Sequence, residues 1–163
     1  MNCFLLDASA LCKWFLPEPG SGLVDRLLTA VDRSRTVALK LNVGEVMSAI
    51  VRRHNRGLLS PLSYAAALAS VAEDLVRDPS FRLMLATGLQ IEQSWHFIEE
   101  HSINATDALL LRCTLDLAAA HRADGDDLVL VAADQRLLAA AQAEGLQTFD
   151  PEEDDQATLD TLL

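Results

Sequence analysis

The chain opens with a short apolar run that ends in an acid. Cys3 to Leu6 are all apolar, Asp7 follows them, and Ser9 stands two residues later. This pattern predicts a buried strand over residues 2–7 that presents a carboxylate at its C-terminal tip, before a helix that begins at Ser9. In an open sheet of parallel strands, ligands bind at that edge.

Three further acids stand where a strand or loop meets a helical pattern. They are Glu45, Asp107 and Asp134. Together with Asp7 they predict one acidic cavity. Carboxylate oxygens are the ligands that Mg²⁺ and Mn²⁺ prefer, and a cation would offset the repulsion among four nearby acids.

Strand patterns alternate with helical patterns along the chain, which predicts an α/β fold with a mostly parallel sheet covered by helices on both faces. Asn42 is expected to cap a helix with Glu45 at its third position, and Gly57 to end it. The helices between residues 42 and 77 are expected to form a clip that protrudes from the sheet. The expected strands are 2–7, 36–41, 81–86, 128–133 and 146–149.

Each acid also has a purely local explanation. Glu45 and Asp107 both follow an Asn by three residues, as in a capping box, and Asp134 is placed to cap the last expected helix. Such caps are common. Asp7 is harder to explain in this way because Ser9 is the better local cap.

The composition and net charge of the chain limit its possible functions. Half of the 163 residues are hydrophobic, and the net charge of -11 argues against a surface that binds nucleic acid unaided. Six acids and no base lie in residues 150–163. The chain is therefore divided into a domain over 1–150 and an acidic C-terminal tail over 151–163, which is expected to be mobile.

The three cysteines are Cys3, Cys12 and Cys113, an odd number without a CxxC pair, and all lie in apolar patterns. They are expected to be buried free thiols in a reducing, cytoplasmic compartment. No apolar run approaches the length of a membrane span.

The four acids resemble those of PIN-domain proteins in their order, spacing and secondary-structure context. The resemblance is greatest to the VapC-type ribonuclease toxins of bacterial toxin–antitoxin pairs. The resemblance extends to about residue 150, and each motif is short but the ordered set is fairly specific. The matching segments are Leu6-Asp7-Ala8-Ser9-Ala10, Asn42-Val43-Gly44-Glu45, Asn104-Ala105-Thr106-Asp107-Ala108 and Leu130-Val131-Ala132-Ala133-Asp134.

The resemblance implies a three-layer PIN-like fold and a Mg²⁺- or Mn²⁺-dependent endoribonuclease that cuts single-stranded or structured RNA. Ser9 would steer water or phosphate by a hydrogen bond. The family commonly forms homodimers, and a cognate antitoxin often inserts a basic side chain into the acidic cavity. The expected metal ligands and catalytic residues are Asp7, Glu45, Asp107 and Asp134.

The chain departs from the family pattern at two places. Ala132 stands where the family often has Ser or Thr, so a hydroxyl that would support Asp134 is missing. Asp107 and Asp134 are also farther apart than in compact members, which leaves Asp126 or Asp127 as less favoured candidates for the fourth acid.

Arg52 and Arg56 form part of the one dense basic stretch. On an ideal helix both return to nearly the face of Glu45, so they are candidates to guide an RNA backbone toward the metal. Stabilisation of a helix C-terminus is the alternative, and it is slightly favoured. None of the four histidines has metal-ligand spacing.

Two other classes of protein share part of this pattern. A phosphatase with Asp7 as nucleophile would want a second acid at position 9, where this chain has Ser9. A PIN-like scaffold that has lost turnover, and binds RNA or a protein partner, is the alternative to the nuclease.

Overall fold

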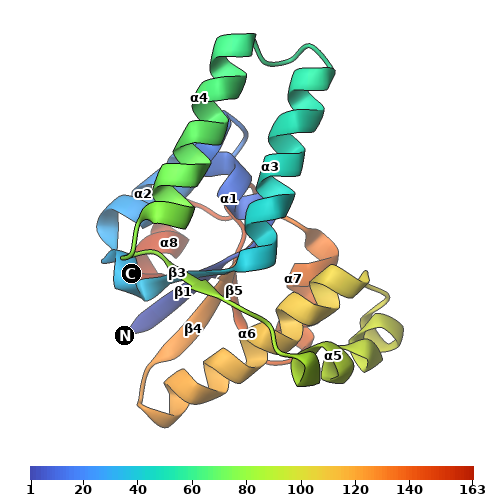
Figure 1. The fold of residues 1–163 in the computed structure, drawn as a ribbon. Helices are drawn as coiled ribbons and strands as arrows, with labels where there is room; N and C mark the ends of the chain where they lie inside the picture. The colour runs from blue at the N-terminus through green and yellow to red at the C-terminus, as the bar shows by residue number, and fades with distance from the viewer.

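Five parallel strands form one central sheet in the computed structural model, which describes residues 1–163 (Figure 1). The order is β3-β2-β1-β4-β5, so the first strand of the chain lies in the middle. Leu5 of β1 is paired with Val37 on one side and with Leu130 on the other. The strands are β1 Asn2–Leu6, β2 Thr36–Leu39, β3 Arg82–Met84, β4 Asp127–Val131 and β5 Gln147–Phe149.

Helices cover both faces of the sheet, as the sequence predicted. Side chains alternate along β1, so that Phe4 and Leu6 belong to one hydrophobic cluster while Cys3 and Leu5 belong to the other. The first cluster includes α1, α2, α3, α4 and α8, and the second includes α5, α6 and α7. The helices are α1 Ala8–Phe15, α2 Ser21–Ala30, α3 Lys40–Asn55, α4 Pro61–Val71, α5 Gly88–His101, α6 Ala105–Ala123, α7 Gln135–Ala143 and α8 Gln156–Leu162.

Side-chain caps and glycines mark several helix ends. The side chains of Ser60, Thr87 and Asn104 each accept a backbone N–H at the start of α4, α5 and α6. Gly57 and Gly145 follow the ends of α3 and α7 with positive φ, the backbone conformation that glycine adopts at low cost.

The clip predicted from the sequence is present. Helices α3 and α4 lie side by side and protrude from the sheet, joined at their far end by a short loop (Figure 1). Ile50, Ala67 and Val71 bury its inner face, and the rings of His54 and Tyr64 stack with centroids 4.2 Å apart. This packing holds the helix that carries Glu45 against the body of the protein.

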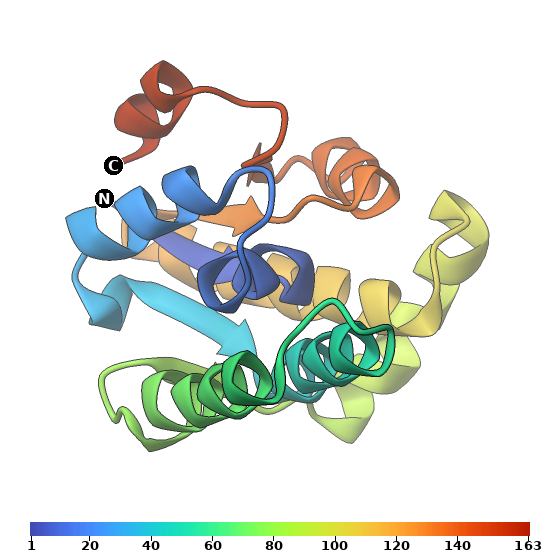
Figure 2. The same cartoon turned by 90° about the horizontal axis from the view of Figure 1, so that it is seen from above.

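The C-terminal segment differs from the expected mobile tail. Residues 156–162 form α8, which lies beside α2 (Figure 2) and buries Leu159 completely. The Asn2 side chain donates to the carbonyl of Leu162 at 2.9 Å, and Arg26 pairs with Asp160 at 2.7 Å. The acids of this segment are therefore partly paired with bases of the body, which composition alone does not reveal.

All three cysteines are buried and unpaired, as predicted. None of the helices combines the length and the apolar content needed to cross a lipid bilayer.

Candidate functional site

Two of the expected acids follow neighbouring strands at the same edge of the sheet. Asp7 comes directly after β1, and Asp134 comes three residues after β4. The two strands pair in parallel up to Leu6 and Val131, and the backbone N–H of Asp7 continues the ladder by donating to the Val131 carbonyl at 2.9 Å. This is the edge where an open α/β sheet binds its ligands.

Asp7 is nearly buried, with 8% of its surface exposed. Its Oδ2 accepts hydrogen bonds from the backbone N–H of Ser9 at 3.0 Å and from the Ser9 hydroxyl at 2.6 Å. Asp7 is thus the N-cap of α1, and the expectation that Ser9 is the cap was wrong. Its other oxygen, Oδ1, accepts from Asn42 at 3.3 Å.

Glu45 lies beside Asp7 on α3, but not at the helical position predicted. The helix begins at Lys40, and Leu39 is its N-cap, so Asn42 is the third residue of the helix and not its cap. The Asn42 amide donates to Glu45 Oε2 at 2.9 Å. Burial raises the pKa of Glu45 and the charge of Asp7 raises it further, while the Asn42 hydrogen bond opposes the shift.

Asp107 lies in the first turn of α6, where Asn104 is the cap as predicted. The Asn104 side chain accepts from the backbone N–H of Asp107 at 2.9 Å and donates to its Oδ2 at 2.7 Å. Burial raises the pKa of Asp107 to about 6, and the charges of Asp134, Asp7 and Glu45 all add to the shift. The four acids are therefore close enough to repel one another.

Asp134 is exposed and caps α7, with Oδ1 accepting from the backbone N–H of Arg136 at 2.9 Å and of Leu137 at 3.2 Å. Asp134 can cap α7 and still bind a ligand at the sheet edge, because its Oδ2 makes no hydrogen bond to the protein. Asp126 and Asp127 lie at the opposite edge, at the start of β4. They pair with the N-terminal amine and with Arg122, so they do not approach the other acids.

The donor set suits a hard divalent cation. We refer to Asp7, Glu45, Asp107 and Asp134 as the strand-edge carboxylates. Three of them keep one oxygen that makes no hydrogen bond to the protein, namely Glu45 Oε1, Asp107 Oδ1 and Asp134 Oδ2. Carboxylate oxygens are the ligands that Mg²⁺ or Mn²⁺ prefers. No three of these four acids have ligand atoms within 4.8 Å of one another, so a bound cation would have to draw them closer together.

The two candidate arginines lie on the clip helix. Arg52 is exposed, and its charge opposes the burial that raises the pKa of Glu45, so the guanidinium lies within electrostatic reach of the site. Arg56 is the C-cap of α3 and is also exposed. Arg53, between them, is bound to Glu18 and is not available to a ligand.

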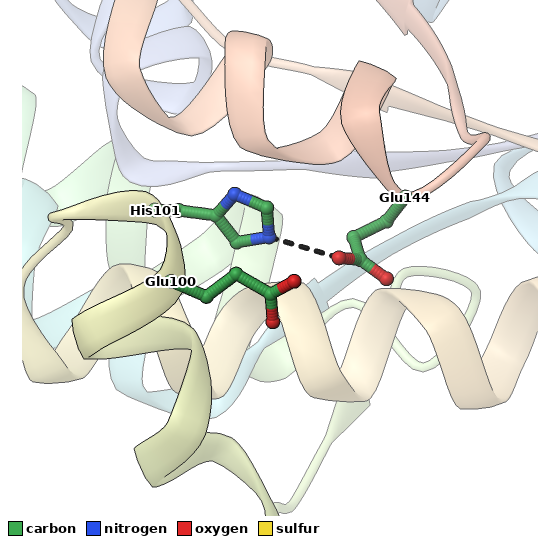
Figure 3. Close-up of side chains that lie close together, drawn as sticks. All are labelled: Glu100, His101 and Glu144. Carbon is green, nitrogen blue, oxygen red and sulfur yellow. Dashed lines mark hydrogen bonds and ion pairs between the residues drawn. The ribbon is translucent and has the colours of Figure 1, made fainter.

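The structure brings together a second group of possible metal ligands that the sequence did not suggest. His101 Nε2 and Glu144 Oε1 are 2.9 Å apart, and Glu100 lies beside them, with the three ligand atoms within 4.8 Å of one another (Figure 3). Sequence spacing gives no signal for it because Glu144 is 43 residues away. The pair joins the C-terminal ends of α5 and α7, and it involves none of the strand-edge carboxylates.

No protein-family model and no curated protein matches the sequence. Solved structures do match it in fold. PAE2754 from Pyrobaculum aerophilum has a TM-score of 0.61 at 22% identity, covering 99% of this chain and 95% of its own. VapC20 from Mycobacterium tuberculosis, described as a toxin that cleaves the sarcin–ricin loop, has a TM-score of 0.61 at 18% identity, covering 84% and 94%.

A toxin–antitoxin complex from Klebsiella pneumoniae gives a TM-score of 0.53 at 18% identity, covering 92% of this chain and 98% of that one. These likenesses extend over nearly the whole chain. At 18–22% identity they confirm the fold alone, which is the three-layer α/β arrangement expected from the sequence.

Proposed function

We propose that the protein is a divalent-cation-dependent endoribonuclease, and that it is the toxin of a toxin–antitoxin pair. One observation carries the proposal. The carboxylates of Asp7, Glu45, Asp107 and Asp134 belong to four separate elements at one sheet edge, and the charges of the other three add to the rise that burial causes in the pKa of Asp107. The fold shared with VapC20, a toxin described as cleaving the sarcin–ricin loop, supports the nuclease activity, and the fold shared with the Klebsiella toxin–antitoxin complex supports the toxin role.

Each residue of the site has a distinct task in this proposal. The strand-edge carboxylates would hold Mg²⁺ or Mn²⁺, which would supply charge stabilisation for the phosphate and lower the pKa of an attacking water. Ser9 donates its one hydroxyl proton to Asp7 and accepts the backbone N–H of Ala133, so it holds Asp7 in place and keeps one lone pair that can accept a hydrogen bond from water. Arg52 and Arg56 bind the RNA backbone along the clip, which positions the scissile phosphate without reading sequence.

The charge of the protein constrains how RNA is held. With a net charge of -11, the surface as a whole repels RNA, so binding depends on the few exposed bases and on the bound cation. This favours a nuclease that needs the cation for substrate binding as well as for chemistry.

A cognate antitoxin and a second copy of the chain are the proposed protein partners. The support is the antitoxin-bound neighbour from Klebsiella and the acidic site itself, which a basic side chain of an antitoxin would neutralise. Light scattering on the purified protein tests the homodimer: a mass of one chain, 17.7 kDa, would contradict it.

The nuclease is tested by incubating purified protein with a mixed pool of single-stranded RNA in Mn²⁺ or in EDTA. We expect cuts in Mn²⁺ that disappear in EDTA and in the variants Asp7→Asn and Asp107→Asn. Glu144→Gln is the matched control, since it neutralises an acid outside the site and should cut at the wild-type rate. A folded protein that binds Mn²⁺ but cuts neither this pool nor ribosomal RNA would instead be a binding scaffold.

A further inference from the structure

Asn42 makes two hydrogen bonds that the local start of α3 does not explain. Its side chain is completely buried, and its amide nitrogen donates to Asp7 Oδ1 at 3.3 Å and to Glu45 Oε2 at 2.9 Å. Its amide oxygen accepts the backbone N–H of Leu39 at 3.2 Å. Both amide hydrogens are therefore used on two carboxylates, while the oxygen is fixed to the end of β2.

The chemistry of the amide suits this position. Asp7 and Glu45 come from different elements and carry like charges, so they would separate unless a donor lay between them. A lysine there would attract both carboxylates but would neutralise the charge that a cation needs. An amide donates two hydrogen bonds without bringing a charge, so the carboxylates are held while their negative charge is kept.

We propose that Asn42 is a positioning residue that fixes the separation of the Asp7 and Glu45 carboxylates and thereby sets the affinity of the site for a divalent cation. The inference rests on the proposed function. Its support is the geometry of one buried side chain that bonds two expected ligands and is itself anchored to the backbone. Partners of this kind around metal ligands typically change affinity on the order of 10- to 100-fold when removed.

A purely structural role is the competing explanation, because the bond to Leu39 also satisfies the start of α3. The chain contains a matched control in Gln90. Its side-chain oxygen accepts the N-cap N–H of Thr87 at 3.0 Å, and its nitrogen donates to the Asp116 carboxylate at 2.9 Å. Gln90 thus has the same two kinds of bond at a helix start, without contact to any strand-edge carboxylate.

The test is calorimetric titration of the full-length protein with MnCl₂, with the melting temperature measured in EDTA. We expect Asn42→Ala to raise the dissociation constant for Mn²⁺ by at least tenfold. Gln90→Ala should lower the melting temperature in EDTA without changing that constant. Asn42→Ser, whose hydroxyl can donate to only one carboxylate, should bind Mn²⁺ with intermediate affinity, and it replaces Asn42→Ala if the alanine variant does not fold.

The outcomes separate this inference from the proposed function. A wild-type protein that binds no Mn²⁺ would remove the proposed function. A wild-type protein that binds Mn²⁺, beside Asn42 variants with the same dissociation constant, would overturn only the role of Asn42 and reduce it to a helix contact.

Discussion

The Ser9 hydroxyl accepts a hydrogen bond of 2.9 Å from the backbone N–H of Ala133, which lies 124 residues later in the chain. The same hydroxyl donates to Asp7 at 2.6 Å. One small side chain thus ties the end of β1 to the loop that carries Asp134. Ala132 supplies no hydroxyl to this loop, and Ser9 provides one from across the sheet edge.

Replacing Ser9 by alanine should therefore disturb two expected ligands at once. We expect Ser9→Ala to weaken Mn²⁺ binding and to slow RNA cleavage, each on the order of tenfold. Ser34→Ala is the matched control, because Ser34 bonds Asp32 through the same backbone and hydroxyl pattern in an exposed turn. Titration with Mn²⁺ and initial cleavage rates measure both variants, and equal losses in the two would contradict a specific role for Ser9.

The raised pKa of Asp107 predicts how stability depends on pH without metal. Burial and three neighbouring acids raise this pKa from 3.8 to about 6, so the folded protein retains a proton that the unfolded chain releases. The contribution of Asp107 to stability is therefore fully present below pH 3.8 and is lost as the pH rises through about 6.

Asp107→Asn should remove this pH dependence and stabilise the metal-free protein at pH 7, by roughly 1 kcal/mol after discounting for solvent screening. The measurement is the melting temperature of variant and wild type in EDTA from pH 4 to pH 8. A variant less stable than the wild type at pH 7 would show that burial and repulsion together do not make the charged Asp107 carboxylate unfavourable in the folded protein.

The sheet and most helix ends followed from local sequence. A run such as Leu128 to Val131 is apolar at every position because both faces of a parallel strand are buried, and the burial found at all four positions agrees. Caps such as Asn104 are predictable because one side chain satisfies nearby backbone groups. The ordering of the four acids along such elements was enough to bring them to one edge.

Two features could not be predicted from local patterns. Asn is a common N-cap residue, and at the third helical position, which Asn42 occupies, its side-chain oxygen likewise accepts a backbone N–H at the helix start. Only the fold shows that its side-chain nitrogen reaches Asp7. Helix α8 lies in an acid-rich segment, and its one buried side chain, Leu159, packs against residues far earlier in the chain. Both depend on contacts between distant segments.

The packing of α8 predicts a cost for disturbing it. Leu159 is fully buried, so Leu159→Ala should destabilise the protein by about 2–5 kcal/mol through lost burial and a residual cavity. Leu62→Ala is the control, since Leu62 is 81% exposed on the clip. Urea unfolding of both variants measures the difference, and a loss below about 1 kcal/mol at Leu159 would contradict a folded C-terminal segment.

The arginines of the clip predict an electrostatic signature in RNA binding. Arg52→Ala should weaken binding of an uncleavable RNA to a similar degree for all sequences and reduce the salt dependence by about one counterion. Arg77→Ala is the control, because Arg77 is exposed but already paired with Glu73 on its own helical turn. Fluorescence anisotropy over a range of salt concentrations measures both, and identical salt slopes for Arg52→Ala and the wild type would remove Arg52 from the RNA path.

Anomalous X-ray diffraction from crystals soaked in MnCl₂ shows whether the strand-edge carboxylates bind a divalent cation. We expect an anomalous peak among the side chains of Asp7, Glu45, Asp107 and Asp134 that disappears in Asp7→Asn crystals. A peak found only between His101 and Glu144, or no peak at all, would contradict it.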